Sequence, residues 1–134
     1  MAQRFPIGVS DFKKIRQGGY YYVDKTLFLQ EWWDQGGDMV VLPRPRRFGK
    51  TLMLSMIQSF FADPADRSLF DDLAIAQTPM MELQGSLPVI LLSLKDLKVE
   101  SFEEFLVSFK RVMSRCYAQF SHLKADLDDR LTAY

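Results

Sequence analysis

A short apolar run, a basic loop and an amphipathic helix follow one another between residues 39 and 62, and this order constrains the fold most. The run, residues 39–42, is bounded by turn residues, as a buried parallel strand is. The loop covers residues 43–49. From Lys50, apolar residues recur every three or four positions until Asp63 and Pro64 end the pattern. The segment therefore predicts a strand, a loop and a helix.

A second strand and helix are predicted further along the chain. Pro88 introduces the apolar run 89–94, and Ser101 can cap a long helix whose apolar residues recur at helical spacing as far as Phe120. Buried strands that alternate with amphipathic helices predict an α/β fold, a parallel sheet with helices on both faces. Two strands are few for such a sheet, so we expect the natural protein to continue beyond Tyr134.

The segments between these units predict shorter elements. Ser10 can cap a short helix over residues 11–16, and residues 20–23 look extended. Asp24 can act as the N-cap of a helix over residues 25–35, which Gly36 and Gly37 would end. Another short helix is expected over residues 68–73.

The composition predicts a cytoplasmic protein that does not associate with membranes. Seventeen basic and seventeen acidic residues give a formal net charge of zero, so no polyanionic partner or membrane surface is indicated. Cys116 is the one cysteine, which excludes a disulfide framework and fits a reducing compartment. The sequence contains no signal-peptide pattern and no apolar run of roughly 20 residues that could span a bilayer.

The loop between the first strand and its helix has the position and the residues of a phosphate-binding loop of the Walker A type. Gly49 lets the backbone approach an oxygen atom, and Lys50 supplies a positive charge for the terminal phosphates. Thr51 offers a hydroxyl group to Mg²⁺, so it is the predicted metal ligand. The partial positive charge at the helix N-terminus adds to the attraction for phosphate. The predicted cofactors are ATP and Mg²⁺, and the predicted nucleotide-binding residues are Arg44, Arg46, Arg47, Phe48, Gly49, Lys50, Thr51 and Leu52.

This loop departs from the usual pattern, because Arg44 stands where a glycine is expected and Pro45 follows it. Proline removes one backbone donor, so the guanidinium groups of Arg44, Arg46 and Arg47 could replace part of the amide cradle. Two alternatives stay open. The arginines could form a solvated surface loop, or they could contact a nucleic-acid backbone, which the zero net charge does not favour.

Four blocks of the sequence stand out together: residues 6–12, 21–26, 44–52 and 88–90. They resemble the AAA-ATPase-like domain of bacterial proteins, a P-loop NTPase-like family whose members often carry a restriction-type PD-(D/E)XK nuclease domain further along. The resemblance implies that this chain is the N-terminal part of a P-loop NTPase core and that the loop sequence, without its first glycine, is a family trait. It also implies that the Walker B acid lies beyond Tyr134.

Three other candidates carry weaker signals. By analogy with related ATPases, residues 22–26 line the adenine or ribose, although helix capping by Asp24 explains that stretch equally well. Asp96 follows the second predicted strand and is a weak candidate for the Walker B acid. His122 has no partner at metal-ligand spacing and is expected to be a surface residue. No catalytic residue is assigned.

The sequence thus predicts the N-terminal portion of one nucleotide-binding domain, with residues 1–37 as an extension and residues 38–134 as strand–helix units. We expect it to bind ATP with Mg²⁺ and, without downstream acids, to hydrolyse ATP poorly. The alternatives are a non-catalytic module for nucleotide sensing or interaction, and a nucleic-acid-binding part of a nuclease-linked system. An incomplete sheet would expose an apolar edge, so self-association is also expected.

Overall fold

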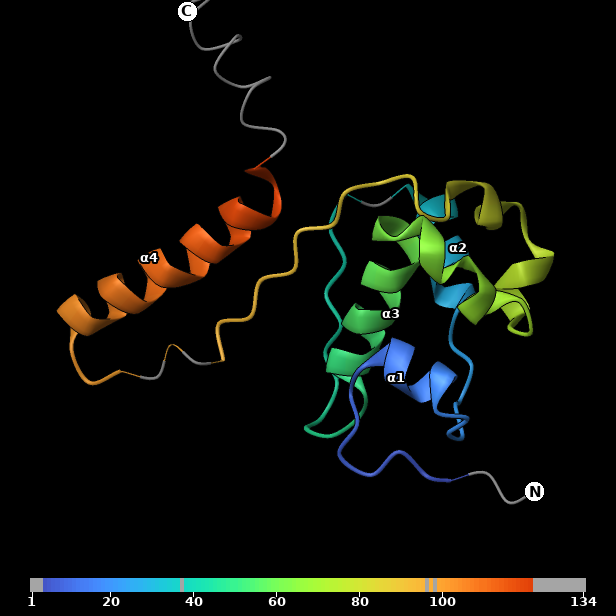
Figure 1. Ribbon diagram of the computed structural model, residues 1–134, viewed down its shortest axis with the longest axis horizontal. Helices are drawn as coiled ribbons and strands as arrows, with labels where there is room; N and C mark the ends of the chain where they lie inside the picture. Colours follow the sequence, from blue (N-terminus) through green and yellow to red (C-terminus); the bar gives the residue numbers. More distant parts are fainter. Residues whose placement is uncertain (1–3, 37, 96, 98, 122–134) are drawn as a thin grey trace, which may run out of the picture. The chain divides into compact units, whose positions relative to one another are not determined.

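The computed structural model describes residues 4–36, 38–95, 97 and 99–121. The chain divides into two compact units, residues 1–89 and 90–134. Among the described residues, the first unit contains three α-helices followed by three short 3₁₀-helices, and the second contains one long α-helix (Figure 1). In chain order these are α1 (Phe12–Gln17), α2 (Leu27–Gln35), α3 (Lys50–Ala62), η1 (Pro64–Phe70), η2 (Ala74–Gln77), η3 (Pro79–Leu83) and α4 (Phe102–Gln119).

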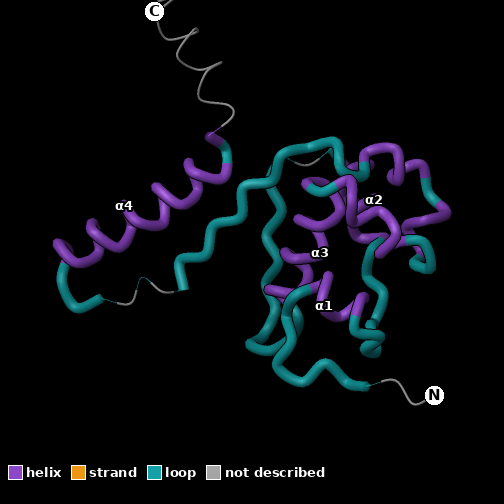
Figure 2. Tube along the Cα trace, in the orientation of Figure 1, coloured by secondary structure: helices purple, strands orange, loops and turns teal. Residues whose placement is uncertain are grey.

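The predicted parallel sheet is wrong, because the described residues contain no strand (Figure 2). A strand exists only where a neighbouring segment accepts and donates its backbone hydrogen bonds. Residues 39–42 and the described run 89–94 have no such ladder, and Val41 and Ile90 are 75% and 62% exposed. Within the described part, pairing is limited to one isolated parallel bridge between Arg4 and Tyr20. Apolar runs indicate burial, but they do not supply a partner.

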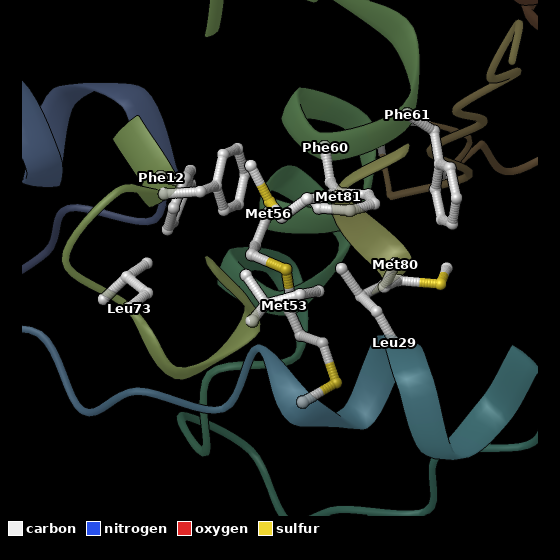
Figure 3. Close-up of a cluster of buried hydrophobic side chains, with 11 residues drawn as sticks. Phe12, Leu29, Met53, Met56, Phe60, Phe61, Leu73, Met80 and Met81 are labelled. Carbon is white, nitrogen blue, oxygen red and sulfur yellow. The ribbon is translucent and has the colours of Figure 1, made fainter. Parts of the chain in front are cut away.

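Helix α3 lies at the centre of the first unit. Its buried residues Met53, Met56 and Phe60 recur at intervals of three and four and therefore share one face. This face packs with Phe12 of α1 and Leu29 of α2 (Figure 3). The three 3₁₀-helices and the turns beside them complete the core with Phe70, Leu73, Ile75, Met80 and Met81. The core thus fixes the first turn of α3 relative to α1.

The structure corrects the predicted starts of the first two helices. Asp11 caps α1 by accepting a hydrogen bond from the N–H of Lys14, so the predicted cap, Ser10, lies one residue before it. Helix α2 begins at Leu27, and Gly36 ends it in the left-handed conformation, as predicted. Gly37 lies outside the described residues.

The two long helices agree with the sequence. Helix α3 runs from Lys50 to Ala62, and Asp63 then caps η1 through the N–H of Ala65. The short helix expected at 68–73 is replaced by the end of η1, at Phe70, and a turn over residues 71–73. In the second unit, Ser101 caps α4 by accepting from the N–H of Glu104. No helix in the described part is long and apolar enough to cross a membrane.

Candidate functional site

The backbone turns sharply at the end of the basic loop. Arg47 and Gly49 adopt the left-handed conformation, with φ of 70° and 75°. This conformation costs a residue with a Cβ atom about 1–2 kcal/mol, so Gly49 suits its place directly before α3. The carbonyl oxygen of Gly49 then accepts the helix's first hydrogen bond, from the N–H of Met53 at 2.9 Å. The turn leaves the N-terminus of α3 at the surface.

Lys50 folds back over the loop that precedes it. Its ammonium group donates a hydrogen bond to the carbonyl oxygen of Arg44, with 2.6 Å between the two atoms. Arg46, Arg47 and Thr51 are exposed at the same turn. The predicted Walker A lysine is therefore held by its own loop in this structure.

A cleft of about 740 Å³ opens beside this turn, and we call it the basic cleft. One wall consists of the loop and the start of α3: Arg46, Arg47, Gly49, Lys50 and Thr51. The other wall is the segment 6–10, which carries no charged side chain. Three cations thus line the cleft without a carboxylate among the residues that form it, which favours a polyanionic ligand.

A second, mainly apolar cleft of about 360 Å³ is also lined by Gly49, and we call it the apolar cleft. Pro6 and Gly49 line both clefts. The rings of Phe5 and Tyr21 lie in contact at its edge, with centroids 5.7 Å apart. Arg44 and Leu52 also line it, whereas Phe48 lines neither cleft and is 61% exposed. Seven of the eight predicted site residues therefore surround the two clefts.

The stretch predicted to line a nucleoside, residues 22–26, divides into two groups. Tyr22, Val23 and Lys25 line the apolar cleft, and whether they contact a ligand stays a prediction. Asp24 and Thr26 have a structural role, described next. The apolar cleft also contains residues outside the predicted stretch, namely Phe5, Pro6 and Tyr21.

Asp24 and Thr26 hold the start of α2 against η2. Asp24 Oδ1 accepts from the N–H of Thr26 at 2.9 Å and from its hydroxyl at 2.7 Å, while Oδ2 accepts from the N–H of Ala74 at 2.7 Å. The buried Thr26 Oγ1 accepts from the N–H of Ile75 at 3.2 Å. Burial alone would raise the pKa of Asp24, but these hydrogen bonds outweigh it and lower the pKa.

Tyr22 connects the apolar cleft with the core. Burial, together with the nearby negative charge of Asp24, raises the pKa of Tyr22 to about 12. The Tyr22 ring meets Phe12 edge to face at a centroid distance of 5.3 Å. The guanidinium of Arg16 lies 6.0 Å from the ring centroid, and Arg16 also binds the Leu69 carbonyl oxygen and Asp72. The neutral phenol is therefore the stable form at this position.

Sequence reasoning missed two contributors to the site. Residues 6–10 carry part of the family resemblance, but the sequence assigns them no role in ligand binding, and it assigns none to Ser55. Ser55 Oγ accepts a hydrogen bond from the N–H of Phe12 at 3.0 Å and so ties α1 to α3. One signal is present, because Ser55 is a polar residue four positions after Thr51, between the apolar Leu54 and Met56.

Two candidates cannot be placed, since Asp96 and His122 lie outside the described residues. Among the residues that are described, no group of three or more His, Cys, Asp or Glu side chains could hold a metal ion. Thr51, the predicted magnesium ligand, is exposed at the basic cleft. Its hydroxyl would need a ligand's phosphate oxygens to complete a magnesium coordination shell.

The family model described as "Predicted AAA-ATPase" matches residues 6–133, so the chain belongs to the AAA-ATPase-like family. The chain is also similar to an uncharacterized protein in the vnfD 5′ region of Azotobacter chroococcum mcd 1, with 47% identity over 70 residues. That match covers 50% of this chain and 13% of the other protein. No solved structure matches the chain. The family resemblance predicted from the four sequence blocks is confirmed.

Proposed function

We propose that this chain binds a nucleoside triphosphate, ATP, together with Mg²⁺, and that the phosphates lie in the basic cleft. The observation that carries the proposal is the composition of this cleft, where Arg46, Arg47 and Lys50 converge on the first turn of α3 without a carboxylate among the lining residues. Membership in the AAA-ATPase-like family supports the same class of ligand.

The backbone adds to the attraction that the side chains provide. The first N–H groups of an α-helix have no partner within the helix, and the aligned peptide dipoles place partial positive charge at that end. Gly49 turns the chain so that the first turn of α3 borders the basic cleft. A phosphate group at this position would accept hydrogen bonds from the helix N-terminus as well as from the cations.

Each predicted residue has a role in this proposal. Lys50 leaves the carbonyl oxygen of Arg44 and donates to the terminal phosphates instead. Thr51 provides its hydroxyl as a ligand to the Mg²⁺ that accompanies the phosphates. Arg46 and Arg47 form charge-assisted hydrogen bonds with phosphate oxygens, which offsets the amide donor lost at Pro45.

The apolar cleft favours a nucleotide over a free polyphosphate. Because both clefts contain Pro6 and Gly49, one ligand with an apolar end and an anionic end can occupy both. A nucleobase is planar and aromatic, and aromatic rings such as Phe5 and Tyr21 are suitable neighbours for it. The volumes of about 360 and 740 Å³ are in the usual range for small-molecule sites.

Binding is better supported than hydrolysis. Hydrolysis needs a group that orients or deprotonates the attacking water, and neither cleft is lined by Asp, Glu or His among the described residues. We therefore propose hydrolysis only for a protein that adds a carboxylate to this site. In its absence the chain acts as a non-catalytic nucleotide-binding module.

Calorimetric titration of MgATP into the wild-type chain and a Lys50→Ala variant tests the proposal. We expect the wild type to bind and the variant to lose at least tenfold in affinity, because a charged hydrogen-bond donor is removed. The matched control is Lys110→Ala, which removes another exposed lysine, from α4, and should bind like the wild type. Equal binding by the Lys50 variant, or none by the wild type, would contradict the proposal.

A further inference from the structure

We propose that residues 6–10, here called the N-terminal strap, form a second phosphate-binding wall in which Ser10 contacts the terminal phosphate and so favours a triphosphate over a diphosphate. The inference rests on the proposed function, since it takes the ligand of the basic cleft to be a nucleotide. It adds Ser10, a residue outside the predicted loop, to the site, and it adds a preference for a triphosphate over a diphosphate.

The strap is fixed at the face of α3 that carries Thr51. Residues four apart on a helix lie on the same face, so Ser55 sits one turn after Thr51. Ser55 Oγ accepts from the N–H of Phe12 at 3.0 Å, which anchors the start of α1 there. The preceding residues then reach back to the first turn of α3, and Figure 1 shows this N-terminal segment beside it.

The other end of the strap is anchored as well. The N–H of Tyr21 donates to the carbonyl oxygen of Arg4 at 2.8 Å, and Arg4 forms a bridge with Tyr20. Within the strap, the N–H of Val9 donates to the carbonyl oxygen of Pro6 at 3.3 Å, and Gly8 has a left-handed φ of 75°. The strap is thus a folded turn held at both ends, not a loose terminus.

The strap has donors that the protein itself does not use. The hydroxyl of Ser10 and the backbone N–H groups of Gly8 and Ser10 donate to no group in the described part of the chain. Ser10 is also exposed where it lines the basic cleft. Neutral donors that face three cations across a cleft suit an anion whose oxygen atoms are contacted from both sides.

The position of Ser10 relative to the two clefts gives the selectivity. Pro6 lines both clefts, whereas Ser10 lines only the basic one. With the nucleoside in the apolar cleft, the phosphates enter the basic cleft past Pro6 and Gly49, which line both clefts, and the proposal places the terminal phosphate of a triphosphate at Ser10. A diphosphate would contact Lys50 and the start of α3 without contacting Ser10.

Calorimetric titration of MgATP and MgADP into the wild-type chain and a Ser10→Ala variant measures this selectivity. We expect the wild type to prefer ATP, and the variant to lose about tenfold in ATP affinity with little change for ADP, because one hydrogen bond to a charged group is removed. The matched control is Ser68→Ala, an exposed serine in η1 that should behave like the wild type.

Ser55 is a positioning residue in this proposal and provides a second test. Ser55→Ala should lower the ratio of ATP to ADP affinity, and Ser55→Thr, which retains the hydroxyl acceptor, should restore it. Circular dichroism would verify that each variant is folded at the temperature of the titration. A purely structural role would weaken ATP and ADP binding together and leave their ratio unchanged.

The outcomes separate this inference from the proposed function. If Lys50→Ala loses ATP binding while Ser10→Ala and Ser55→Ala keep the wild-type ratio, the basic cleft binds nucleotide but the strap does not select the terminal phosphate. If Ser10→Ala lowers the affinities for ATP and ADP equally, the strap contacts a part of the ligand that both nucleotides share, and the proposed preference for a triphosphate is wrong. If the wild type binds neither nucleotide, both proposals fail.

Discussion

The ammonium group of Lys50 and the carbonyl oxygen of Arg44 are 2.6 Å apart and joined by a hydrogen bond that closes the basic loop on itself. The bond is exposed to solvent, so water can replace either partner. A ligand that accepts the same proton therefore competes with a weak interaction. This explains how Lys50 can be held in the structure and still be available to a phosphate.

Lys50→Ala should consequently have little effect on stability. We expect its free energy of unfolding to fall by about 0.5 kcal/mol, the scale of an exposed substitution, when both proteins are unfolded in urea and followed by circular dichroism. A decrease of several kcal/mol would show that the bond organises the loop, and the binding loss would then need another explanation.

Thr26→Val should destabilise the first unit. The Thr26 hydroxyl is buried, accepts a hydrogen bond from the N–H of Ile75 and donates one to Asp24. Valine leaves the N–H of Ile75 without its acceptor and Asp24 without this donor. We expect a loss of about 2 kcal/mol in urea unfolding, since a buried unsatisfied polar group costs about 1–3 kcal/mol. Thr51→Val, at an exposed position, is the control and should stay within about 0.5 kcal/mol of the wild type. Equal losses would refute the assigned role of Thr26.

Gly85→Ala should be more harmful than Gly19→Ala, although both glycines have a positive φ, 70° and 63°. A Cβ atom at Gly85 would lie 2.5 Å from the Cα atom of Pro64, while nothing lies within 4 Å of one at Gly19. Gly19→Ala therefore measures the backbone cost alone, about 1–2 kcal/mol. The clash at Gly85 should add about 1–3 kcal/mol in thermal unfolding. Equal melting temperatures would mean that the Pro64 backbone yields easily.

The features that sequence reasoning found depend on neighbours close in the chain. Helix α3 was predicted from its periodicity and its stop at Asp63, and α4 from its periodicity and the cap at Ser101; both helices are present. The loop before Lys50 was found because its residues are contiguous. Each of these signals lies within a few positions of the structure it predicts.

The features that sequence reasoning missed depend on residues far apart in the chain. Residues 39–42 are apolar, but only a partner segment makes a strand, and the sequence does not name one. Thr26 contacts Ile75, and Phe12 contacts Ser55, across 49 and 43 positions. The wall that the strap adds to the basic cleft depends on the second of these contacts, and the polar residue at position 55 does not by itself identify Phe12 as its partner.

Tyr22 gives the fold a specific dependence on alkaline pH. The pKa of this phenol is raised to about 12 in the folded chain, mainly by burial, against an ordinary value of about 10. Below about pH 9 the tyrosine is mainly neutral in both states, and its contribution to stability is nearly constant. Between about pH 10 and 12 the unfolded chain binds fewer protons at this group than the folded chain does, so the free energy of unfolding falls as the pH rises.

Tyr22→Phe removes this titration and keeps the ring that packs on Phe12. The variant should therefore lose less stability than the wild type between pH 9 and 11.5, a range of about 2.5 units that spans the start of the titration. Urea unfolding at several pH values in this interval measures the difference. Tyr117→Phe, at a position in α4 that is 70% exposed, should follow the wild-type curve. If the Tyr22 variant follows it too, ionisation of Tyr22 does not contribute to alkaline unfolding, because its phenol is then as well solvated in the folded chain as in the unfolded one.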